Sequence, residues 1–337
     1  LLKVIGAIND KFNLPGINAS QAEILSNKYH YLEAFKKVGI LTPTNYQLIS
    51  DSEVAVFSED ISFPCICKPV EGNGSYGVYV ARSHNDLVWF FAPEDNDTMF
   101  SELSRFNQTV HPSGRIRNYL YHSYGGDYLI QEFLSGPTVS VAGNFFSNGY
   151  TVDMVYDIET SDLPYRSEFG FSYPSRLDSI EKQVEDVVKS IWENIDVPNG
   201  PYMIDFICSG EQLFLVDFSP RTSSSTLELL FYALDSNEYA CNSILAMLGE
   251  NVECLIPKKP VKFCYFNLPS GTFKNITFPK CVELASELSF HLKAGDGIYT
   301  PRNDTQVAAR GHVVFSGNKA GCLMQQFLEG IEYTIES

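Results

Sequence analysis

Basic residues are scarce in this sequence of 337 residues. It has 24 Lys and Arg against 41 Asp and Glu, which gives a formal net charge of −17 at pH 7. The basic residues stand singly or in pairs such as Lys36-Lys37 and Lys258-Lys259, so they form no cationic patch. A negative field of this kind repels nucleic-acid phosphates and anionic lipid headgroups. We therefore expect neither nucleic acid nor a membrane surface as a partner.

Long apolar stretches and metal-binding cysteine pairs are also missing. No apolar run approaches the ~20 residues that a membrane-spanning helix needs, and the first residues do not resemble a signal peptide. The eight cysteines include no CxxC pair and no zinc-type spacing with histidine, which argues against a secreted disulfide scaffold. We expect these cysteines to be buried structural thiols of a cytoplasmic protein.

Strand-like and helix-like segments alternate along the chain. Apolar residues at helical spacing predict helices over 20–39, 179–195 and 225–234. Capping boxes are predicted at Ser20 with Glu23 and at Ser225 with Glu228. Strands are predicted over 63–70, 77–83, 127–134, 138–146, 150–158, 202–209 and 212–219. Several hairpins mixed with helices favour an α+β fold with a largely antiparallel sheet.

A glycine-rich segment with the pattern G-x-G-x-x-G follows the strand-like FPCICKPV. A dinucleotide-binding fold would require a helix directly after this loop, but the alternating GVYVARS follows instead. We therefore predict a β-hairpin loop whose amides close over a phosphate chain, with a purely structural turn as the alternative. Lys68 lies four residues before the loop in an apolar strand, where its charge would be costly unless it faced a cleft or an anion.

Two aspartates lie in the middle of strand-like segments that a short turn at Gly210 joins. Asp205 belongs to YMIDFICS and Asp217 to QLFLVDFS, and both have apolar neighbours. The alternation of strand side chains allows both carboxylates to project from one face. Two like charges in a dry site repel each other unless a cation separates them, and oxygen ligands suit Mg²⁺ bound to nucleotide phosphates. Two solvent-facing aspartates are the alternative.

In this order, the motifs resemble those of the ATP-grasp superfamily, from about Leu14 to the C-terminus. LPGINASQAEILSNK resembles the segment that ends in a phosphate-contacting lysine, here Lys28. FPCICKPVEGNGSYGV resembles the second lysine strand with its phosphate loop, and YLIQEFLSG resembles the hinge strand that contacts adenine. GPYMIDFICSGEQLFLVDFSPR resembles the metal hairpin. The likeness is greatest to carboxylate–amine ligases of the L-amino acid ligase type, and weaker to biotin carboxylase and D-alanine–D-alanine ligase.

The resemblance implies an α+β fold in which two lobes hold ATP between mainly antiparallel sheets. It implies a remnant of an N-terminal domain over 1–27, a small lobe over 28–134, a large lobe over 135–250 and a C-terminal closing domain over 251–337. It further implies an enzyme that joins a small carboxylate to an amine or amino acid through an acylphosphate, forming ADP.

The same resemblance assigns roles to individual residues. Lys68 and Arg221 are implied to be catalytic, and Asp205, Asp217 and Ser219 to bind Mg²⁺, or Mn²⁺ in its place. The implied ATP contacts are Lys28, Lys68, Gly72, Gly74, Ser75, Gly77, Gln131, Glu132, Phe133, Leu134 and Thr138. The candidate substrate contacts are Arg166, Glu168, Arg176, Arg302 and Arg310. For the first three of these, a surface-loop role is the alternative.

Three positions depart from the pattern of the superfamily. The metal strand reads Asp217-Phe218-Ser219-Pro220-Arg221 in place of Glu-x-Asn-x-Arg. Thr138 stands where a ribose-binding acid is usual, and Gln131 replaces the first hinge carboxylate. These changes leave a non-catalytic nucleotide-binding protein as one alternative, and a carboxylase-type ATPase subunit as another. We expect small-molecule carboxylate and amine substrates, and the sequence also allows a homodimer.

Overall fold

The computed structural model describes residues 2–50, 56–72, 78–91, 127–161, 168–269, 271–298 and 310–336. Within these ranges, the strands form three sheets, and every strand pairing is antiparallel. The helices are α1 (Leu2–Phe12), α2 (Ala19–Leu25), α3 (Lys28–Lys37), α4 (His84–Phe91), α7 (Ile180–Asn194), α8 (Ser224–Leu234), α9 (Glu238–Met247), the 3-10 helix η1 (Lys280–Leu284) and α11 (Ala320–Gly330). The strands are β1 (Asn45–Ile49), β2 (Cys65–Pro69), β3 (Tyr79–Ala81), β4 (Tyr128–Glu132), β5 (Thr138–Phe146), β6 (Gly149–Tyr150), β7 (Met154–Thr160), β8 (Glu168–Tyr173), β9 (Gly200–Ser209), β10 (Gln212–Ser219), β11 (Val261–Tyr265), β12 (Gly271–Thr277), β13 (Glu287–Phe290), β14 (Gly297–Ile298), β15 (Gly311–Ser316) and β16 (Glu332–Glu336).

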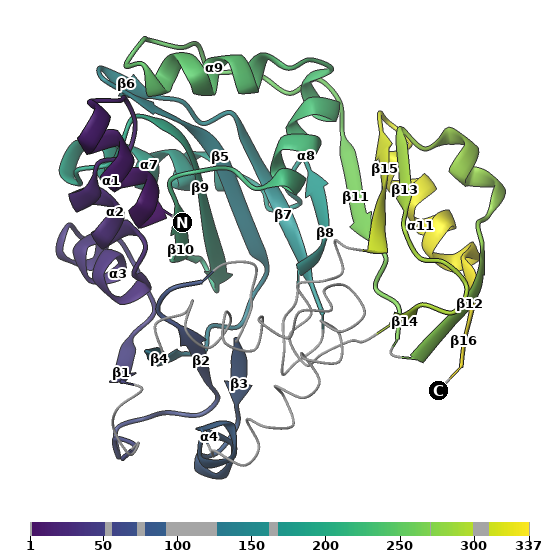
Figure 1. Ribbon diagram of the computed structural model, residues 1–337, viewed down its shortest axis with the longest axis horizontal. Helices are drawn as coiled ribbons and strands as arrows, with labels where there is room; N and C mark the ends of the chain where they lie inside the picture. Colours follow the sequence, from purple (N-terminus) through teal and green to yellow (C-terminus); the bar gives the residue numbers. More distant parts are fainter. Residues whose placement is uncertain are drawn as a thin grey trace.

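A four-stranded sheet with the order β1-β4-β2-β3 lies below the large sheet in Figure 1. Cys65 and Cys67 of β2 join Leu87 and Phe90 of α4 in a core on one face of this sheet. Because side chains alternate along a strand, Lys68 projects from the opposite face. The cysteines of β2 thus fix the direction in which this lysine points.

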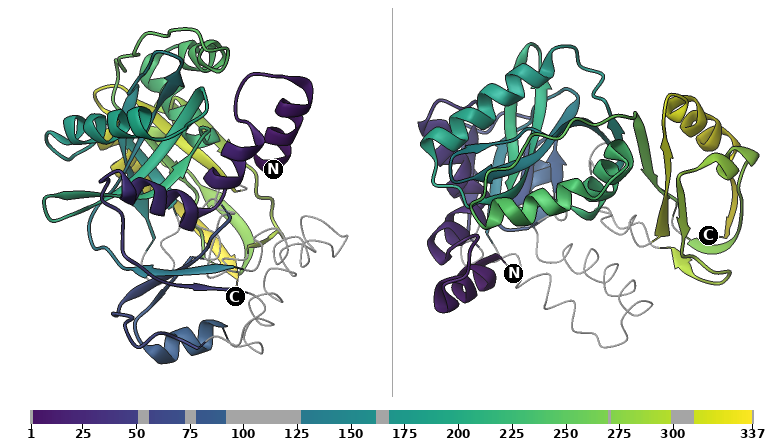
Figure 2. Two further views of the ribbon diagram at one scale, coloured as in Figure 1. Left: turned by 90° about the vertical axis from the view of Figure 1, so that its left-hand side faces the viewer. Right: turned by 90° about the horizontal axis from the view of Figure 1, so that it is seen from above.

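The large sheet has nine strands, in the order β10-β9-β5-β7-β8-β11-β15-β13, with β6 added beside β5. On one face, α7 buries Ile180, Val184 and Ile191 against β5, β9 and β10. On the other face, α8 and α9 pack against β5, β7, β8 and β11. Figure 2 shows α7 and α9 on opposite sides of the sheet when the molecule is seen from above. The predicted α+β fold with mainly antiparallel sheets is confirmed.

The N-terminal region differs from the single helix that we predicted over 20–39. The structure has two helices there, α2 and α3, because Asn27 caps the start of the second one. The capping box of α2 uses Asn18 and Gln21, so the predicted box at Ser20 is wrong. As a consequence of the second cap, Lys28 stands at the first position of α3.

Residues beyond 250 continue the large sheet, since β11 pairs with β8 on one side and with β15 on the other. A three-stranded sheet, β14-β12-β16, and α11 complete this part at the right of Figure 1. The division that we predicted between 250 and 251 therefore falls within one continuous sheet. The boundary at 250 stays a prediction.

All eight cysteines are free thiols in the structure. Cys65, Cys67 and Cys264 are buried as expected, but three others are exposed: Cys241, Cys254 and Cys322. The expectation of buried thiols is therefore wrong for these three. Cys241 lies in α9, Cys322 in α11 and Cys254 in the connection between α9 and β11. Among the described residues, no helix has the length and apolar character needed to cross a membrane.

Candidate functional site

Asp205 of β9 and Asp217 of β10 lie directly opposite each other in an antiparallel hairpin. Opposite residues of such a pair project from the same face, with Cβ atoms about 4.5–5.5 Å apart. The turn between the strands contains Gly210 with a φ of 62°, a conformation that glycine adopts without strain. The prediction that both carboxylates share one face is thus confirmed by the register.

A β-bulge at Val216 determines the direction of Asp217. The register advances by two residues on β10, from Leu215 to Asp217, while it moves by one residue on β9. Leu215 and Phe218 consequently both enter the core beneath α7, although they are three positions apart. A regular strand would send residue 217 into that core, so the bulge keeps the carboxylate out of it.

The Asp205 carboxyl group is buried and poorly satisfied. The residue is 9% exposed, and its Oδ1 atom has no hydrogen-bond partner among the described residues. Burial raises the pKa of Asp205 well above its usual value, and the nearby charges of Glu168 and Asp217 raise it further. A buried anion of this kind is stabilised by a cation that provides the missing partner.

Two lysines from other elements contact strand β10 of the aspartate hairpin. Lys68 Nζ donates to the carbonyl oxygen of Val216, the residue at the bulge, at 3.0 Å. Lys28 Nζ donates to the carbonyl oxygen of Gly72 at 2.8 Å and lies 3.3 Å from Asp217 Oδ1. Lys28 comes from α3, Lys68 from the small sheet and Asp217 from the large sheet, so three separate elements meet at this point.

Lys68 is a strongly perturbed base. It is 7% exposed, and its pKa is lowered from 10.5 to about 8, chiefly by burial and in part by the charge of Lys28. The carboxylates of Asp217 and Asp205 act in the opposite direction without cancelling the effect of burial. An anion bound beside Lys68 would favour its protonated form.

Tyr31 is a functional candidate that the sequence reasoning missed. Its hydroxyl group donates to Asp217 Oδ1 and accepts a hydrogen bond from the backbone N–H of Phe218 at 3.4 Å. The residue is 1% exposed, and burial, followed by the charge of Asp217, raises its pKa well above the usual value. Tyr31 lies on α3 one turn after Lys28, a position that becomes informative once the fold is known.

The predicted adenine-contacting segment joins the two sheets. Glu132 ends β4, and its backbone N–H donates to the carbonyl oxygen of Thr44 at 2.9 Å. Phe133 and Leu134 lie in the connection, and Thr138 begins β5. Gln131 is 1% exposed and donates to Asn45 Oδ1 at 2.8 Å, so its side chain is bound within the small sheet.

The phosphate loop and part of the predicted substrate contacts fall outside the described residues. Of the loop, Gly72 is described, and its carbonyl oxygen accepts from Lys28. The predictions at Gly74, Ser75, Gly77, Arg166 and Arg302 lie outside the described residues.

Three further predicted residues, Ser219, Glu168 and Arg221, differ in their relation to the aspartate pair. Ser219 ends β10 opposite Met203, two positions beyond Asp217. Glu168 begins β8 near Asp205, whose pKa it raises. Arg221 is exposed, and its guanidinium group donates to the neighbouring Thr222 carbonyl oxygen at 3.4 Å.

Two arginines among the substrate candidates instead form contacts that hold the fold together. Arg176 donates from Nε to Asp157 Oδ2 at 2.8 Å. Arg310 is 3% exposed and donates to the carbonyl oxygen of Leu268 at 3.2 Å. These contacts support structural roles for both arginines, and their assignment to the substrate stays a prediction.

Comparisons with known proteins agree with the observed fold. Residues 61–227 match the family described as ATP-grasp domain. A protein named "Uncharacterized protein y4rH" from Sinorhizobium fredii is 30% identical over 227 residues, which cover 66% of this chain and 41% of that protein. The match therefore spans less than half the length of this curated relative.

Two solved structures show the same fold. L-amino acid ligase from Bacillus licheniformis superposes with a TM-score of 0.77 at 14% identity, covering 99% of this chain and 79% of that chain. The biotin carboxylase domain of 2-oxoglutarate carboxylase from Hydrogenobacter thermophilus, in complex with MgADP, ADP and bicarbonate, gives a TM-score of 0.64 at 14% identity. That alignment covers 99% of this chain and 72% of the other.

Proposed function

Since this chain is an ATP-grasp protein, we propose that it is an ATP- and Mg²⁺-dependent ligase that joins a small carboxylate to an amine. The observation that carries the proposal is the meeting of Lys28 and Lys68 with the Asp205–Asp217 pair. Two cations beside two carboxylates form a site for a metal-bound polyphosphate.

The side chains fit a magnesium–nucleotide complex. Asp205 Oδ1 is a buried oxygen without a partner among the described residues, and Asp217 faces the same side of the hairpin. Oxygen donors of this type suit Mg²⁺, which would neutralise charge on the phosphates. We assign Asp205 and Asp217 as the ligands, with Ser219 as a weaker one, and Mn²⁺ satisfies the same donor set.

The lysines and Tyr31 then have distinct tasks. Lys28 and Lys68 bind phosphate oxygens of ATP, and Tyr31 fixes the orientation of Asp217. The connection after β4, with Glu132, is proposed to contact the adenine through its backbone, as the resemblance implies. Holding the reactants in line is the main contribution of the protein, because phosphoryl transfer requires little acid–base chemistry.

The proposed reaction has two steps. A carboxylate oxygen of the substrate bonds to the γ-phosphorus of ATP while the bond to the β–γ bridging oxygen breaks, which gives an acylphosphate and ADP. The amine nitrogen then attacks the acyl carbon, loses a proton, and displaces inorganic phosphate. Arg221, in this proposal, neutralises charge on the acylphosphate.

A direct test measures phosphate release from ATP in the presence of Mg²⁺ and pools of amino acids and other small carboxylates. We expect release that depends on at least one pool, and its loss in Lys68→Met and Asp217→Asn. The exposed residues Lys189 and Asp186 of α7 provide matched controls, so Lys189→Met and Asp186→Asn should retain the parent rate. Parallel assays with Mn²⁺ show whether it replaces Mg²⁺.

A non-catalytic nucleotide-binding protein is the second candidate function. The exposed position of Arg221, whose guanidinium group donates to the carbonyl oxygen of its neighbour Thr222, favours this alternative. Calorimetric titration separates the two: ATP binding that does not need Mg²⁺, without phosphate release from any pool, supports the second candidate and contradicts the ligase.

A further inference from the structure

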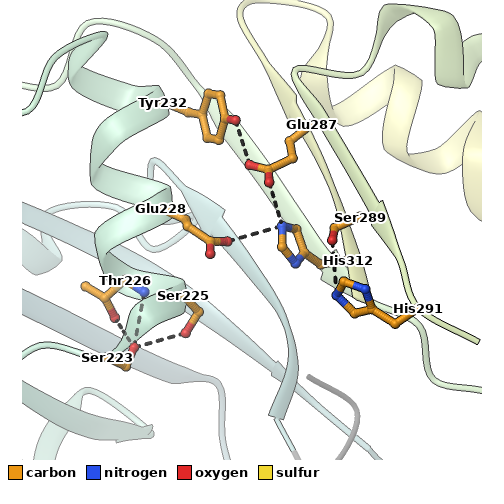
Figure 3. Close-up of polar contacts among 9 residues, drawn as sticks. All are labelled: Ser223, Ser225, Thr226, Glu228, Tyr232, Glu287, Ser289, His291 and His312. Atoms are coloured by element: carbon orange, nitrogen blue, oxygen red, sulfur yellow. Dashed lines mark hydrogen bonds and ion pairs between the residues drawn. The ribbon is translucent and has the colours of Figure 1, made fainter. Parts of the chain in front are cut away.

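A second group of metal-ligating side chains lies away from the aspartate hairpin. Glu228 of α8, Glu287 of β13 and His312 of β15 offer three donor atoms that lie within 4.8 Å of one another (Figure 3). His312 Nε2 is 3.3 Å from Glu228 Oε2 and 3.6 Å from Glu287 Oε1. The cluster thus joins a helix on the large sheet to the two last strands of that sheet.

The donor atoms converge without forming hydrogen bonds to one another. Glu228 Oε2 and His312 Nε2 are both buried, and neither has a hydrogen-bond partner among the described residues. Buried polar atoms are usually paired, so two such atoms aimed at one point indicate a missing ligand. Burial raises the pKa of Glu228, the charge of His312 acts in the opposite direction, and the charge of Glu287 adds a smaller rise.

Two of the three separations between donor atoms match those of a tetrahedral metal site. With bonds of about 2.0–2.2 Å from zinc to nitrogen and oxygen, tetrahedral geometry places neighbouring ligand atoms roughly 3.3–3.6 Å apart. Both measured separations from His312 Nε2 fall in that range. An imidazole with two carboxylates favours a divalent transition-metal cation over Mg²⁺ or Ca²⁺, which prefer oxygen donors alone.

Neighbouring groups hold two of the ligands in place. The Tyr232 hydroxyl donates to Glu287 Oε2 at 2.7 Å, which leaves Oε1 directed at His312. The imidazole ring of His312 stacks on Phe263, with ring centroids 4.8 Å apart and an interplanar angle of 18°. Such support is typical of metal ligands, whose orientation is fixed by hydrogen bonds and packing around them.

The cap of α8 explains why Glu228 is available. We predicted a capping box of Ser225 with Glu228, but Ser223 caps the helix by accepting from Thr226 N–H at 3.1 Å. Glu228 is therefore free of the cap and extends toward His312, as Figure 3 shows. The predicted box is wrong, and its glutamate belongs to the cluster.

We propose that Glu228, Glu287 and His312 form a binding site for a Zn²⁺-class divalent cation that fastens α8 to β13 and β15. The two carboxylates and a neutral imidazole carry a charge of −2, which one divalent cation neutralises. The site is separate from the proposed nucleotide site, so its existence does not depend on the ligase activity. Three protein ligands leave a fourth position for water.

The test titrates the chelator-treated full chain with Zn²⁺ against a chromophoric chelator, with excess Mg²⁺ present to occupy the aspartate pair. We expect one tight equivalent of Zn²⁺ and a higher melting temperature on binding. Glu287→Gln and His312→Ala should weaken this binding by about 100-fold or more, and Tyr232→Phe by about 10-fold. Co²⁺ in place of zinc should give absorption bands without thiolate charge transfer, which excludes the cysteines.

His291→Ala is the matched control, because His291 lies near the cluster in Figure 3 but bonds to Ser289. It should bind Zn²⁺ as the parent does. If Glu287→Gln, which preserves the shape of the side chain, and His312→Ala both keep the parent affinity, the proposal is wrong. Absence of a tight equivalent in the parent would overturn it equally and would leave the cluster as an ion-pair network.

Discussion

The buried ammonium group of Lys68 is a costly charge in the candidate site. It is almost completely removed from water, and its nearest acceptor is a backbone carbonyl rather than a carboxylate. Its pKa of about 8 against an ordinary value of 10.5 means that the folded protein releases this proton more readily than the unfolded chain. The unfolded chain therefore binds more protons between these two pH values, so stability rises with pH across that window.

Lys68→Met should remove this pH dependence. We expect the unfolding free energy of the parent to gain about 2 kcal/mol from Lys68 between about pH 7.5 and about pH 9.5, and the variant to lack this gain. Urea unfolding at the two pH values measures the difference. Lys189→Met, at an exposed lysine, should keep the parent slope, and an equal slope in Lys68→Met would show that Lys68 is not perturbed.

Tyr31→Phe tests the positioning of Asp217. The variant keeps the ring packing against Phe35 and Phe218 but loses the hydroxyl that donates to the carboxylate. We expect a loss of about 1–3 kcal/mol in stability and a Mg²⁺ requirement for phosphate release that is about 10-fold higher. Excess Mg²⁺ should restore the rate. Tyr29→Phe is the control, and an unchanged Mg²⁺ curve in Tyr31→Phe would mean that the tyrosine is only structural.

Residue types and spacing were sufficient to single out Lys68, Asp205 and Asp217, whereas Lys28 was implied by the family resemblance alone. Lys68 and Asp205 interrupt apolar strands, and such interruptions are visible in a sequence. Tyr31 was missed because a tyrosine in an amphipathic helix is ordinary, and only the tertiary fold places its hydroxyl at Asp217. The exposure of Arg221 could not be predicted, since it depends on the chain direction after β10.

At the scale of elements, the bulge in β10 and the connection after β4 have the greatest influence on the site. The bulge left no sequence signal, because Val216 is an ordinary strand residue without a neighbouring glycine or proline. Asn27 divides residues 20–39 into two helices because it caps the second one. The division was missed because the apolar spacing is helical on both sides of Asn27. Period-two alternation predicts that a strand exists, but it cannot predict where one extra residue reverses the faces.

Gly136 in the connection between β4 and β5 should tolerate no side chain. Its φ is +151°, and a Cβ atom would lie 1.8 Å from the carbonyl oxygen of Cys208. Gly210 also has a positive φ, +62°, but a Cβ atom there meets nothing within 4 Å. We expect Gly136→Ala to cost about 3 kcal/mol or more and Gly210→Ala about 1–2 kcal/mol, as measured by urea unfolding. Equal costs would contradict the close approach at Gly136.

At the scale of the whole molecule, the large sheet joins segments that the sequence resemblance divides. Phe171 of β8 pairs with Phe263 of β11, and both lie in the core that α8 covers. The predicted C-terminal domain therefore supplies part of the core of the predicted large lobe. Sequence patterns could not predict this continuity, because the paired residues Phe171 and Phe263 lie 92 positions apart in the chain (263 − 171).

A chain that ends at residue 250 should not fold cooperatively. It would lose β11 and expose the edge of β8 together with the apolar residues under α8. A chain that ends at residue 330 loses β16, whose residues are mostly exposed, and should keep a cooperative transition at a modestly lower temperature. Thermal melting and size-exclusion chromatography compare the two. Cooperative melting of the shorter chain would support the predicted boundary.

In the nucleotide-free protein, the ion pair between Lys28 and Asp217 competes with the binding of phosphate and metal. Each partner is the proposed contact of a different ligand, since the lysine would bind phosphate and the aspartate would bind the metal. Phosphate that binds the lysine frees the aspartate for the metal, and metal that binds the aspartate frees the lysine for phosphate. The two ligands are therefore thermodynamically linked: each must strengthen the binding of the other by the same factor.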